Sequence, residues 1–395
     1  MTDSIALTLA TRLLRILAAT VAAIVTARAL GPEGRGIYVF VVTVALLVTQ
    51  LGSLGLPSSN TYLVARDRSL LAPLASNSFF VALAVGGLGG ALTAFVLSGT
   101  SAGWLIWLST LLAPATMFFL LATNLLVGAG RIVAFNVVET VANLGVLALL
   151  LGAAALALDV EWFLAATIAG WTAAAVLVLT VLPRSGRMPR FHGDLFRRGL
   201  SYALRAYVLT LLGFLVLRAN VFLLERLSST RELGYFSIAA QVADVLIVVP
   251  SSVALVLFPR LARDGRAGFG ATIRAATVVG VLLVLACAIV AALAPWAIES
   301  VFTTEFSPSA EVLRWLLPGV VALGVATVLS QYLAALRFPA SLFAVWISAF
   351  AVVVGLGIWL TERYDAVGAA AATSAAHVWL LAGTIAVTFR HRAQR

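Results

Sequence analysis

Long apolar runs separated by short polar segments dominate the sequence. A membrane-spanning helix needs about 18–20 predominantly apolar residues in succession, and dividing the chain at charges and at Gly and Pro clusters gives twelve such runs. The expected spans are residues 13–30, 36–56, 73–97, 103–128, 134–156, 163–182, 201–224, 234–258, 273–298, 312–335, 340–361 and 366–389. The pattern therefore predicts an all-α polytopic membrane protein with about twelve transmembrane helices.

Composition supports this class and excludes a water-soluble enzyme. Of the 395 residues, 62% are hydrophobic and 11% are charged, whereas a soluble domain carries about 25% charged residues. The single cysteine, Cys287, lies in an apolar run, so neither an internal disulfide nor a cysteine metal cluster can form. The three histidines are scattered, and no Walker A sequence occurs. We therefore expect no catalytic residues, no metal site, no cofactor and no enzymatic activity.

The net charge of +10 reports topology rather than binding to nucleic acid. All 26 basic residues are arginines, and two of them lie inside a span. With the N-terminus inside, eighteen fall in inner segments and only six in outer ones, namely Arg28, Arg35, Arg226, Arg231, Arg314 and Arg363. Because basic residues are enriched in cytoplasmic loops, this bias predicts a multi-pass protein of the bacterial inner (plasma) membrane with both termini cytoplasmic.

The longest polar stretch divides the twelve spans into two sets of six. Residues 183–200 are expected to form a cytoplasmic, Arg-rich linker between an N-terminal six-helix lobe, residues 1–182, and a C-terminal six-helix lobe, residues 201–395. No outer loop exceeds about 15 residues, so none could hold a folded catalytic domain outside the membrane. Two six-helix lobes around a central cavity are typical of an alternating-access transporter.

A faint internal repeat agrees with this division. The tripeptide Pro57-Ser58-Ser59 recurs as Pro250-Ser251-Ser252, and the following Ala-Arg-Asp at 65–67 recurs at 262–264. Six spans per copy give both copies the same orientation in the membrane. The sequence therefore indicates a parallel repeat.

Polar side chains inside the seventh and eighth spans are the first candidates for function. Arg218 and Asp244 both lie deep in their spans, where a charge is costly, and an ion pair between these consecutive antiparallel helices is geometrically possible. Asn220 follows Arg218 by two residues, and Gln241 shares a helix face with Asp244. Such residues either pair between helices or line a cavity, and the sequence leaves both interpretations open.

The N-terminal half holds a second set of candidates. Glu139 belongs to a polar stripe in the fifth span, about five residues from its inner end, and Asn124 lies in the fourth span. Arg15 and Arg28 lie near opposite ends of the first span, where Arg15 also fits the role of an anchor at the cytoplasmic interface.

Several motifs resemble those of a known family. They are RALGPEGRGIY at residues 28–38, LGLPS at 54–58, LRANV at 217–221, GYF at 234–236 and FPRL at 258–261. They are similar to segments of the polysaccharide and oligosaccharide (Wzx-like) flippases, which belong to the multidrug/oligosaccharidyl-lipid/polysaccharide (MOP) exporter superfamily. With the six-plus-six layout, the resemblance covers nearly the whole chain. The position of Asn220 is commonly Asp in related sequences, which puts an ionic role for that site in doubt.

The resemblance implies transport of a polyprenyl-pyrophosphate-linked oligosaccharide from the cytoplasmic to the outer leaflet, for cell-surface polysaccharide assembly. It places basic residues in the cavity to hold the pyrophosphate, a role that Arg218, Arg15 and Arg28 would take, because arginine donates bidentate hydrogen bonds to phosphate. Asn220, Gln241 and Asn124 are further candidates for substrate binding. Expected partners are this lipid-linked oligosaccharide, membrane lipids, and polysaccharide polymerase and export proteins. As a hypothesis, an H⁺ or Na⁺ gradient drives transport, with Asp244 or Glu139 as the coupling carboxylate.

Two other functions compete with this interpretation. A cation-coupled multidrug antiporter of the same superfamily would need an acidic cavity, whereas two arginines balance two carboxylates among the charges inside the spans. An integral-membrane glycan polymerase or glycosyltransferase, which belongs to a different class, would need a long outer loop, and none is present. A major-facilitator transporter also has six plus six spans, but the loop at residues 65–68 lacks the Gly-rich basic motif of that group.

Overall fold

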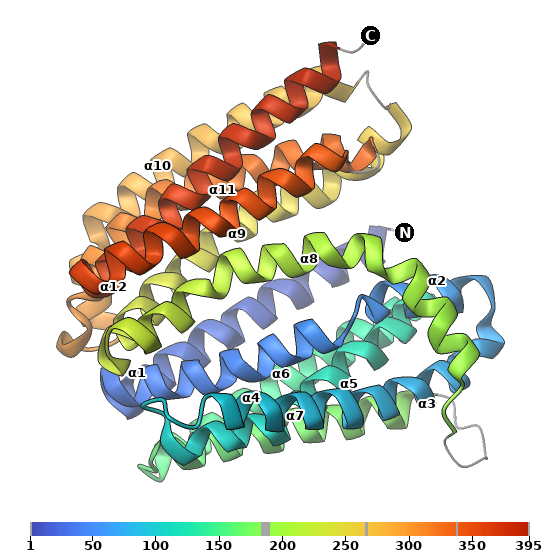
Figure 1. Cartoon of the computed structure of the whole chain (residues 1–395), viewed down its shortest axis with the longest axis horizontal. Coiled ribbons are helices and arrows are strands. Elements are labelled where there is room, and N and C mark those ends of the chain that lie inside the picture. The colour runs from blue at the N-terminus through green and yellow to red at the C-terminus, as the bar shows by residue number, and fades with distance from the viewer. Residues whose placement is uncertain (1, 183–189, 265–267, 337–338, 394–395) are drawn as a thin grey trace. The chain divides into compact units, whose positions relative to one another are not determined.

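The computed structural model describes residues 2–182, 190–264, 268–336 and 339–393, and these residues form helices joined by short turns (Figure 1). Residues 183–189 of the predicted linker lie outside the described residues. Ten helical stretches in the described parts are long and apolar enough to cross a membrane. Two of them are broken, α1 at Gly31 and α12 at Tyr364 and Asp365. Counting each broken helix twice gives twelve spans, which confirms the predicted fold class.

The chain divides into two compact units. Unit 1 comprises Met1–Leu30 and Ile37–Leu211, and unit 2 comprises Gly31–Gly36 and Leu212–Arg395. The short segment Gly31–Gly36 of the first half thus packs with unit 2, and α8 is shared between the units. The lobe boundaries at residues 182 and 201 stay a prediction.

The helices of unit 1 begin with α1 (Thr2–Gly52), of which residues 31–36 belong to unit 2. The elements that follow are α2 (Leu56–Arg66), η1 (Arg68–Leu70), α3 (Leu71–Val81), the π-helical turn η2 (Ala82–Gly86), α4 (Gly87–Val96), η3 (Gly103–Leu108), α5 (Ser109–Gly128), α6 (Ile132–Ala155), α7 (Val160–Val181) and the first part of α8 (Gly193–Leu227). The helix α8 begins eight residues before the expected seventh span.

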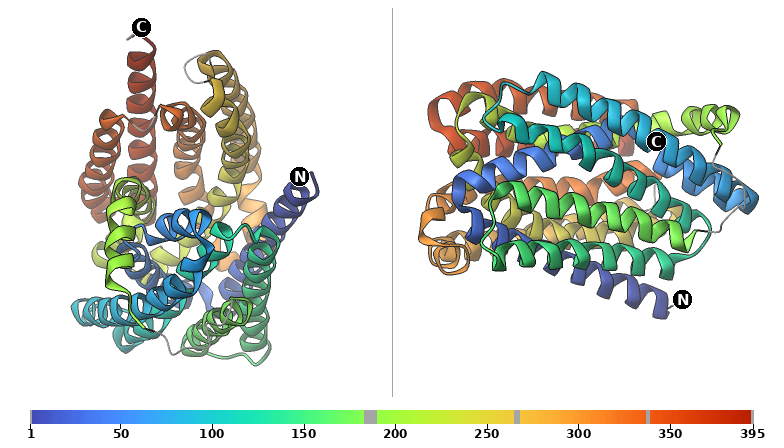
Figure 2. Two further views of the ribbon diagram at one scale, coloured as in Figure 1. Left: turned by 90° about the vertical axis from the view of Figure 1, so that its right-hand side faces the viewer. Right: turned by 90° about the horizontal axis from the view of Figure 1, so that it is seen from below.

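Unit 2 contains the second part of α8, then α9 (Thr230–Asp264), α10 (Phe269–Val301), η5 (Thr304–Phe306), α11 (Ser309–Ala335) and α12 (Ala340–Ala393). Figure 1 shows α9, α10, α11 and both parts of α12 running alongside one another, and the left view of Figure 2 shows the same arrangement turned by 90°. The helix α11 packs against α9, α10 and α12.

One helix in each half is much more buried than the rest. In the spans that contain α5 and α11, 61% of the apolar window is buried, against at most 33% in any other span. Each is the fourth span of its half and carries an internal proline, Pro114 in α5 and Pro318 in α11. This equivalence is what the predicted parallel repeat requires. It also explains where the cores lie, because the other helices of each unit pack around this central one.

The two copies of the Pro-Ser-Ser repeat differ in local structure. In the second copy, α9 continues as a helix through Pro250, whereas in the first the chain breaks between α1 and α2. Leu54 and Gly55 there have positive φ values of 47° and 74°. A Cβ at Gly55 would lie 2.8 Å from Cβ of Tyr207 and 2.9 Å from the carbonyl oxygen of Ala203 on α8, so glycine is required by both conformation and space. The Tyr207 hydroxyl donates to the carbonyl of Leu51 at 2.7 Å and satisfies an acceptor that the break frees.

A second close approach lies where the Gly31–Gly36 segment meets the start of α9. A Cβ added to Gly36 would lie 1.8 Å from the carbonyl oxygen of Thr230, and one added to Gly234 would lie 2.0 Å from that of Pro32. The backbones therefore touch with no side chain between them, as in the small-residue contacts of membrane helices. The side chain of Arg35 is buried beside this contact and donates from Nε to Oγ of Ser237 at 3.3 Å.

The contact predicts opposite effects of the same substitution at two helical glycines. Gly36→Ala forces backbone apart and should destabilise the protein by about 1–3 kcal/mol, the usual cost of overpacking. Gly145→Ala is the matched control, since a Cβ at Gly145 on α6 meets nothing within 4 Å, and it should leave stability unchanged or raise it by up to about 1 kcal/mol. Thermal unfolding of the two purified variants measures the difference. Equal melting temperatures would contradict the close packing.

Candidate functional site

The most buried ion pair in the described residues lies in unit 1, between α1 and α6. Arg15 Nη1 donates to Oε2 of Glu139 at 2.9 Å, and the two side chains are only 22% and 19% exposed. Glu139 lies seven residues after the start of α6, roughly 10 Å along the helix at 1.5 Å per residue. A charge at this depth is costly without a partner. The pair explains how both side chains can stay in the membrane.

The guanidinium of Arg15 has more donors than the pair uses. Arginine carries five N–H donors, and the described contact to Glu139 engages Nη1. Its Nε is buried and has no hydrogen-bond partner among the described residues. The guanidinium therefore has N–H donors left for an additional oxyanion, and the planar arrangement of these donors matches the geometry of phosphate.

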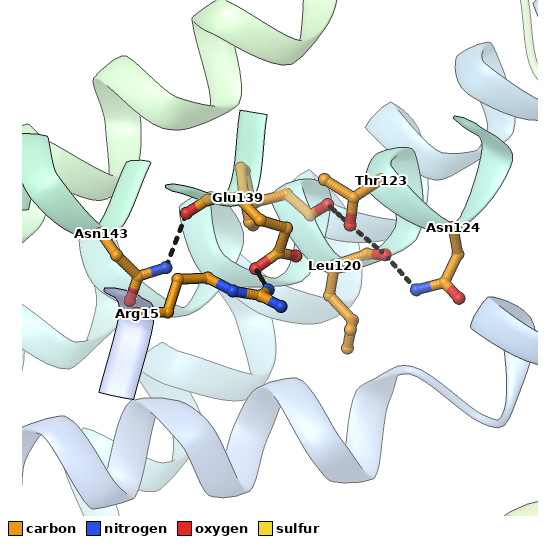
Figure 3. A network of polar contacts seen from close by, with 7 residues as sticks. Arg15, Leu120, Thr123, Asn124, Glu139 and Asn143 are labelled. Atoms are coloured by element: carbon orange, nitrogen blue, oxygen red, sulfur yellow. Dashed lines mark hydrogen bonds and ion pairs between the residues drawn. The ribbon is translucent and has the colours of Figure 1, made fainter. Parts of the chain in front are cut away.

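The polar side chains around this pair have structural partners (Figure 3). Asn143 donates to the carbonyl of Glu139 at 2.8 Å, one turn along α6. Asn124 donates to the carbonyl of Leu120 at 2.9 Å on its own helix, and its carbonyl oxygens accept from Thr61. The hydrogen bonds of Asn124 thus tie α5 to α2. The expected contact of Asn124 with the substrate stays a prediction.

A second ion pair lies in unit 2, between α8 and α9. Arg218 Nη2 lies 3.6 Å from Oδ2 of Asp244, and the side chains are 37% and 56% exposed. The contact is longer than the 2.7–2.9 Å of a direct charged hydrogen bond. Arg218 and Asp244 therefore pair as the sequence allowed, but more loosely than Arg15 and Glu139.

The two remaining candidates of unit 2 differ in burial, since Asn220 is buried between helices and Gln241 is partly exposed. Asn220 is buried, and its amide donates to Oγ1 of Thr373 on α12 at 3.1 Å, which joins two helices. Gln241 is partly exposed, on the helix face that carries Asp244. Of the candidates beside the ion pair, Gln241 remains suited to contact a substrate.

The structure does not bring Arg28 to Arg15. The two residues lie on one straight part of α1, thirteen residues and therefore roughly 20 Å apart, and Arg28 is exposed three residues before the break at Gly31. Sequence reasoning missed Arg35, which it counted as an outer-loop residue, although the structure buries it against Ser237. Gly36 was the available signal, since a glycine beside Arg35 allows close backbone packing around it.

The guanidinium groups of these sites are suited to binding an anion. No group of three or more His, Cys, Asp or Glu side chains in the described part of the chain could hold a metal ion. Each described ion pair instead combines one guanidinium with one carboxylate. Such a pair can exchange its partner, because an arriving oxyanion can take the arginine while a cation or proton neutralises the carboxylate.

Twelve spans, with two ion pairs among the described residues inside them, define a polytopic membrane protein. Residues 1–264 match the model of a family described as polysaccharide biosynthesis protein. The chain therefore belongs to this polysaccharide biosynthesis family. A comparison with curated proteins gives no significant match.

Solved structures show the same fold at low sequence identity. A multidrug resistance MATE family transporter of the MOP superfamily, in an inward-facing conformation, matches with a TM-score of 0.76 and 13% identity, over 96% of this chain and 94% of that one. The lipid II flippase MurJ matches with a TM-score of 0.69 and 13% identity, over 98% and 87%. A MOP superfamily transporter from Pyrococcus furiosus matches with a TM-score of 0.63 and 14% identity, over 99% and 94%. The resemblance in fold to transporters of the MOP superfamily is thereby confirmed, and the match over residues 1–264 shows the polysaccharide biosynthesis family.

The two ion pairs should differ in their contribution to stability. A double-mutant cycle on Arg15→Ala and Glu139→Ala should give a coupling of about 1–3 kcal/mol, because each single change leaves a largely buried charge unsatisfied. The same cycle on Arg218→Ala and Asp244→Ala should give about 1 kcal/mol or less, as for exposed pairs. Reversible denaturation in detergent measures both cycles. A larger coupling for the second pair would contradict the difference in geometry.

Proposed function

We propose that this protein is a flippase that moves a polyprenyl-pyrophosphate-linked oligosaccharide from the cytoplasmic to the outer leaflet by alternating access. The observation that carries the proposal is Arg15, a largely buried guanidinium that pairs with Glu139 and whose Nε has no hydrogen-bond partner among the residues that the structure describes. A pyrophosphate supplies the oxyanions that such a group binds. Membership of a polysaccharide biosynthesis family supports the glycan part of the substrate.

The proposed mechanism begins with the ion pair of unit 1. In the empty protein Glu139 holds Arg15 in a fixed rotamer. When the substrate arrives, its pyrophosphate replaces the carboxylate as partner of the guanidinium, and H⁺ or Na⁺ neutralises Glu139. Asp244 and Arg218 offer the same exchange in unit 2, with Gln241 beside them. The hydrocarbon chain of the substrate stays in the bilayer throughout, so only the polar headgroup needs a path.

The multidrug antiporter is the second candidate, favoured by the MATE fold. A cationic drug would need a carboxylate free of internal cations. Both described in-span carboxylates that the sequence singled out, Glu139 and Asp244, face an arginine within 3.6 Å. This charge balance favours an anionic substrate. Polysaccharide polymerase and export proteins are proposed partners, because the chain belongs to a polysaccharide biosynthesis family.

Transport by proteoliposomes tests the proposal directly. The purified protein is reconstituted with a labelled lipid-pyrophosphate-oligosaccharide, and the label exposed to an outside probe is followed in time. Arg15→Ala should slow transport about 10- to 100-fold, the worth of one to two charged hydrogen bonds. Arg15→Lys should remain impaired, because lysine keeps the charge but loses the planar fork. Glu139→Gln should transport without its dependence on an ion gradient.

The matched control is Arg66→Ala, which removes an exposed arginine that contacts Tyr62 and lies outside both ion pairs. It should transport like the unchanged protein. Equal exposure of label in empty vesicles and protein-containing vesicles would refute the flippase. Uptake of a cationic dye in place of the lipid would instead support the antiporter.

The orientation in the membrane has its own test, since Cys287 is the single cysteine and Cys287→Ala gives a cysteine-free background. In that background, Ser98→Cys should react with a membrane-impermeant maleimide in intact cells, because the turn after α4 is expected outside. Ser69→Cys in η1 should react only after permeabilisation. Both serines are exposed, so access to solvent is matched. The reverse labelling pattern would place both termini outside.

A further inference from the structure

A groove of about 510 Å³ runs along α10, α11 and the second part of α12. Its walls are almost entirely apolar, with small or branched side chains such as Gly280, Val284, Val325 and Ile385. Thr277 and Thr388 are its polar residues, and the Thr388 hydroxyl is already used by the carbonyl of Thr384 at 2.7 Å. A groove of this kind fits a hydrocarbon chain and offers little to a sugar or a free ion.

The length of the groove corresponds to one leaflet. On α10 it extends from Ile273 to Leu285, twelve residues and therefore roughly 18 Å at 1.5 Å per residue. Half of the hydrocarbon core of a bilayer is about 15 Å thick. The groove can therefore hold an acyl chain over the depth of a single leaflet.

Two exposed arginines lie at one end of the groove. Arg274 continues the stripe formed by the lining residues Thr277, Val281 and Leu285, at intervals of three and four residues along α10. Arg390 follows the lining residue Phe389 on α12. The rings of Phe269 and Phe389 touch edge to face with centroids 5.5 Å apart, which brings the arginine-bearing ends of the two helices together.

On the three helices that line the groove, the described acidic residues lie away from this end. The acidic residues of α10 and α11, Glu299 and Glu311, lie at the opposite ends of these helices, and the second part of α12 has none after Asp365. The neighbouring His391 ring bonds the carbonyl of Val387 within its own helix. An apolar groove that ends in two exposed guanidiniums complements a lipid with a phosphate headgroup.

The groove is separate from the proposed transport site. It takes none of its lining residues from α8 or α9, which carry Arg218 and Asp244. Its dimensions are those of an acyl chain in one leaflet, and the expected cytoplasmic leaflet is the anionic one. These observations favour a resident lipid of the bilayer over the polyprenyl chain of the substrate.

We propose that this groove binds one acyl chain of an anionic phospholipid and that Arg274 and Arg390 hold its phosphate headgroup. The bound lipid fills the surface between α10 and α12 and fixes α12 against the rest of unit 2. The site is independent of the flippase proposal, since it needs no transported substrate.

The test is photolabelling of the full-length purified protein with phosphatidylglycerol that carries a diazirine on its acyl chain. Labelled peptides from α10 and α12 are quantified, with diazirine phosphatidylcholine as the zwitterionic comparison. Phosphatidylglycerol should label these peptides more strongly than phosphatidylcholine. Each of Arg274→Ala and Arg390→Ala should weaken phosphatidylglycerol labelling about fivefold, as expected for one basic residue at an anionic surface, and should leave phosphatidylcholine labelling unchanged.

A pair of valines on α10 gives the matched control for the groove itself. Val281 lines the groove and is 55% exposed, while Val278 is 53% exposed and lies outside the lining. Val281→Trp should abolish the strong labelling and Val278→Trp should keep it, with both variants checked for folding by their melting temperatures. Equal labelling by the two phospholipids, equal effects of the two tryptophans, or stronger labelling by a diazirine polyprenyl phosphate would overturn the proposal.

Discussion

The cost of placing a charge or an unpaired backbone group in hydrocarbon governs this structure. It explains why the described residues are helical, since a helix satisfies its backbone within one segment. It also explains the two ion pairs. Glu139 accepts a hydrogen bond from Arg15, and the carboxylate of Asp244 lies 3.6 Å from the guanidinium of Arg218. Such pairs do not strongly stabilise a protein, because desolvation consumes much of the attraction. Their effect is to let charged side chains remain inside spans where an unpaired charge would be costly.

The cost of an unpaired backbone group also explains the hydrogen bonds at the helix breaks. Tyr207 donates to the carbonyl of Leu51 beside the break at Gly55. At the break in α12, the Asp365 carboxylate accepts from the hydroxyl of Ser228, and the amide of Ala366 donates to Glu232. Within the described chain, these two breaks are supported by side chains from neighbouring helices.

The sequence predicted the fold well, but it predicted the side-chain partners of the candidate residues only in part, and the reason is physical. A run of apolar residues is itself the signal for a segment buried in lipid, so the twelve spans followed from the hydropathy pattern along the chain. Side-chain partners depend instead on helix rotation and packing. Glu139 and Arg15 are 124 residues apart in sequence, and nothing local to either residue specifies the other. For the same reason the sequence did not show that the oxygens of Asn124 accept from Thr61 on α2, or that the amide of Asn220 donates to Thr373 on α12.

Arg35 shows the same limit of sequence-based prediction, because it was expected in an outer loop and is buried. Its flanking charges and glycines are typical of an exposed loop, and the hydropathy pattern placed it there. It is buried because Gly36 and Gly234 let two backbones meet, which leaves the guanidinium enclosed beside Ser237. The segment Gly31–Gly36 thereby packs with the unit formed by the second half of the chain. A piece of the first half of the sequence thus packs within unit 2. The two halves of the sequence repeat and the two compact units of the structure therefore do not contain the same residues.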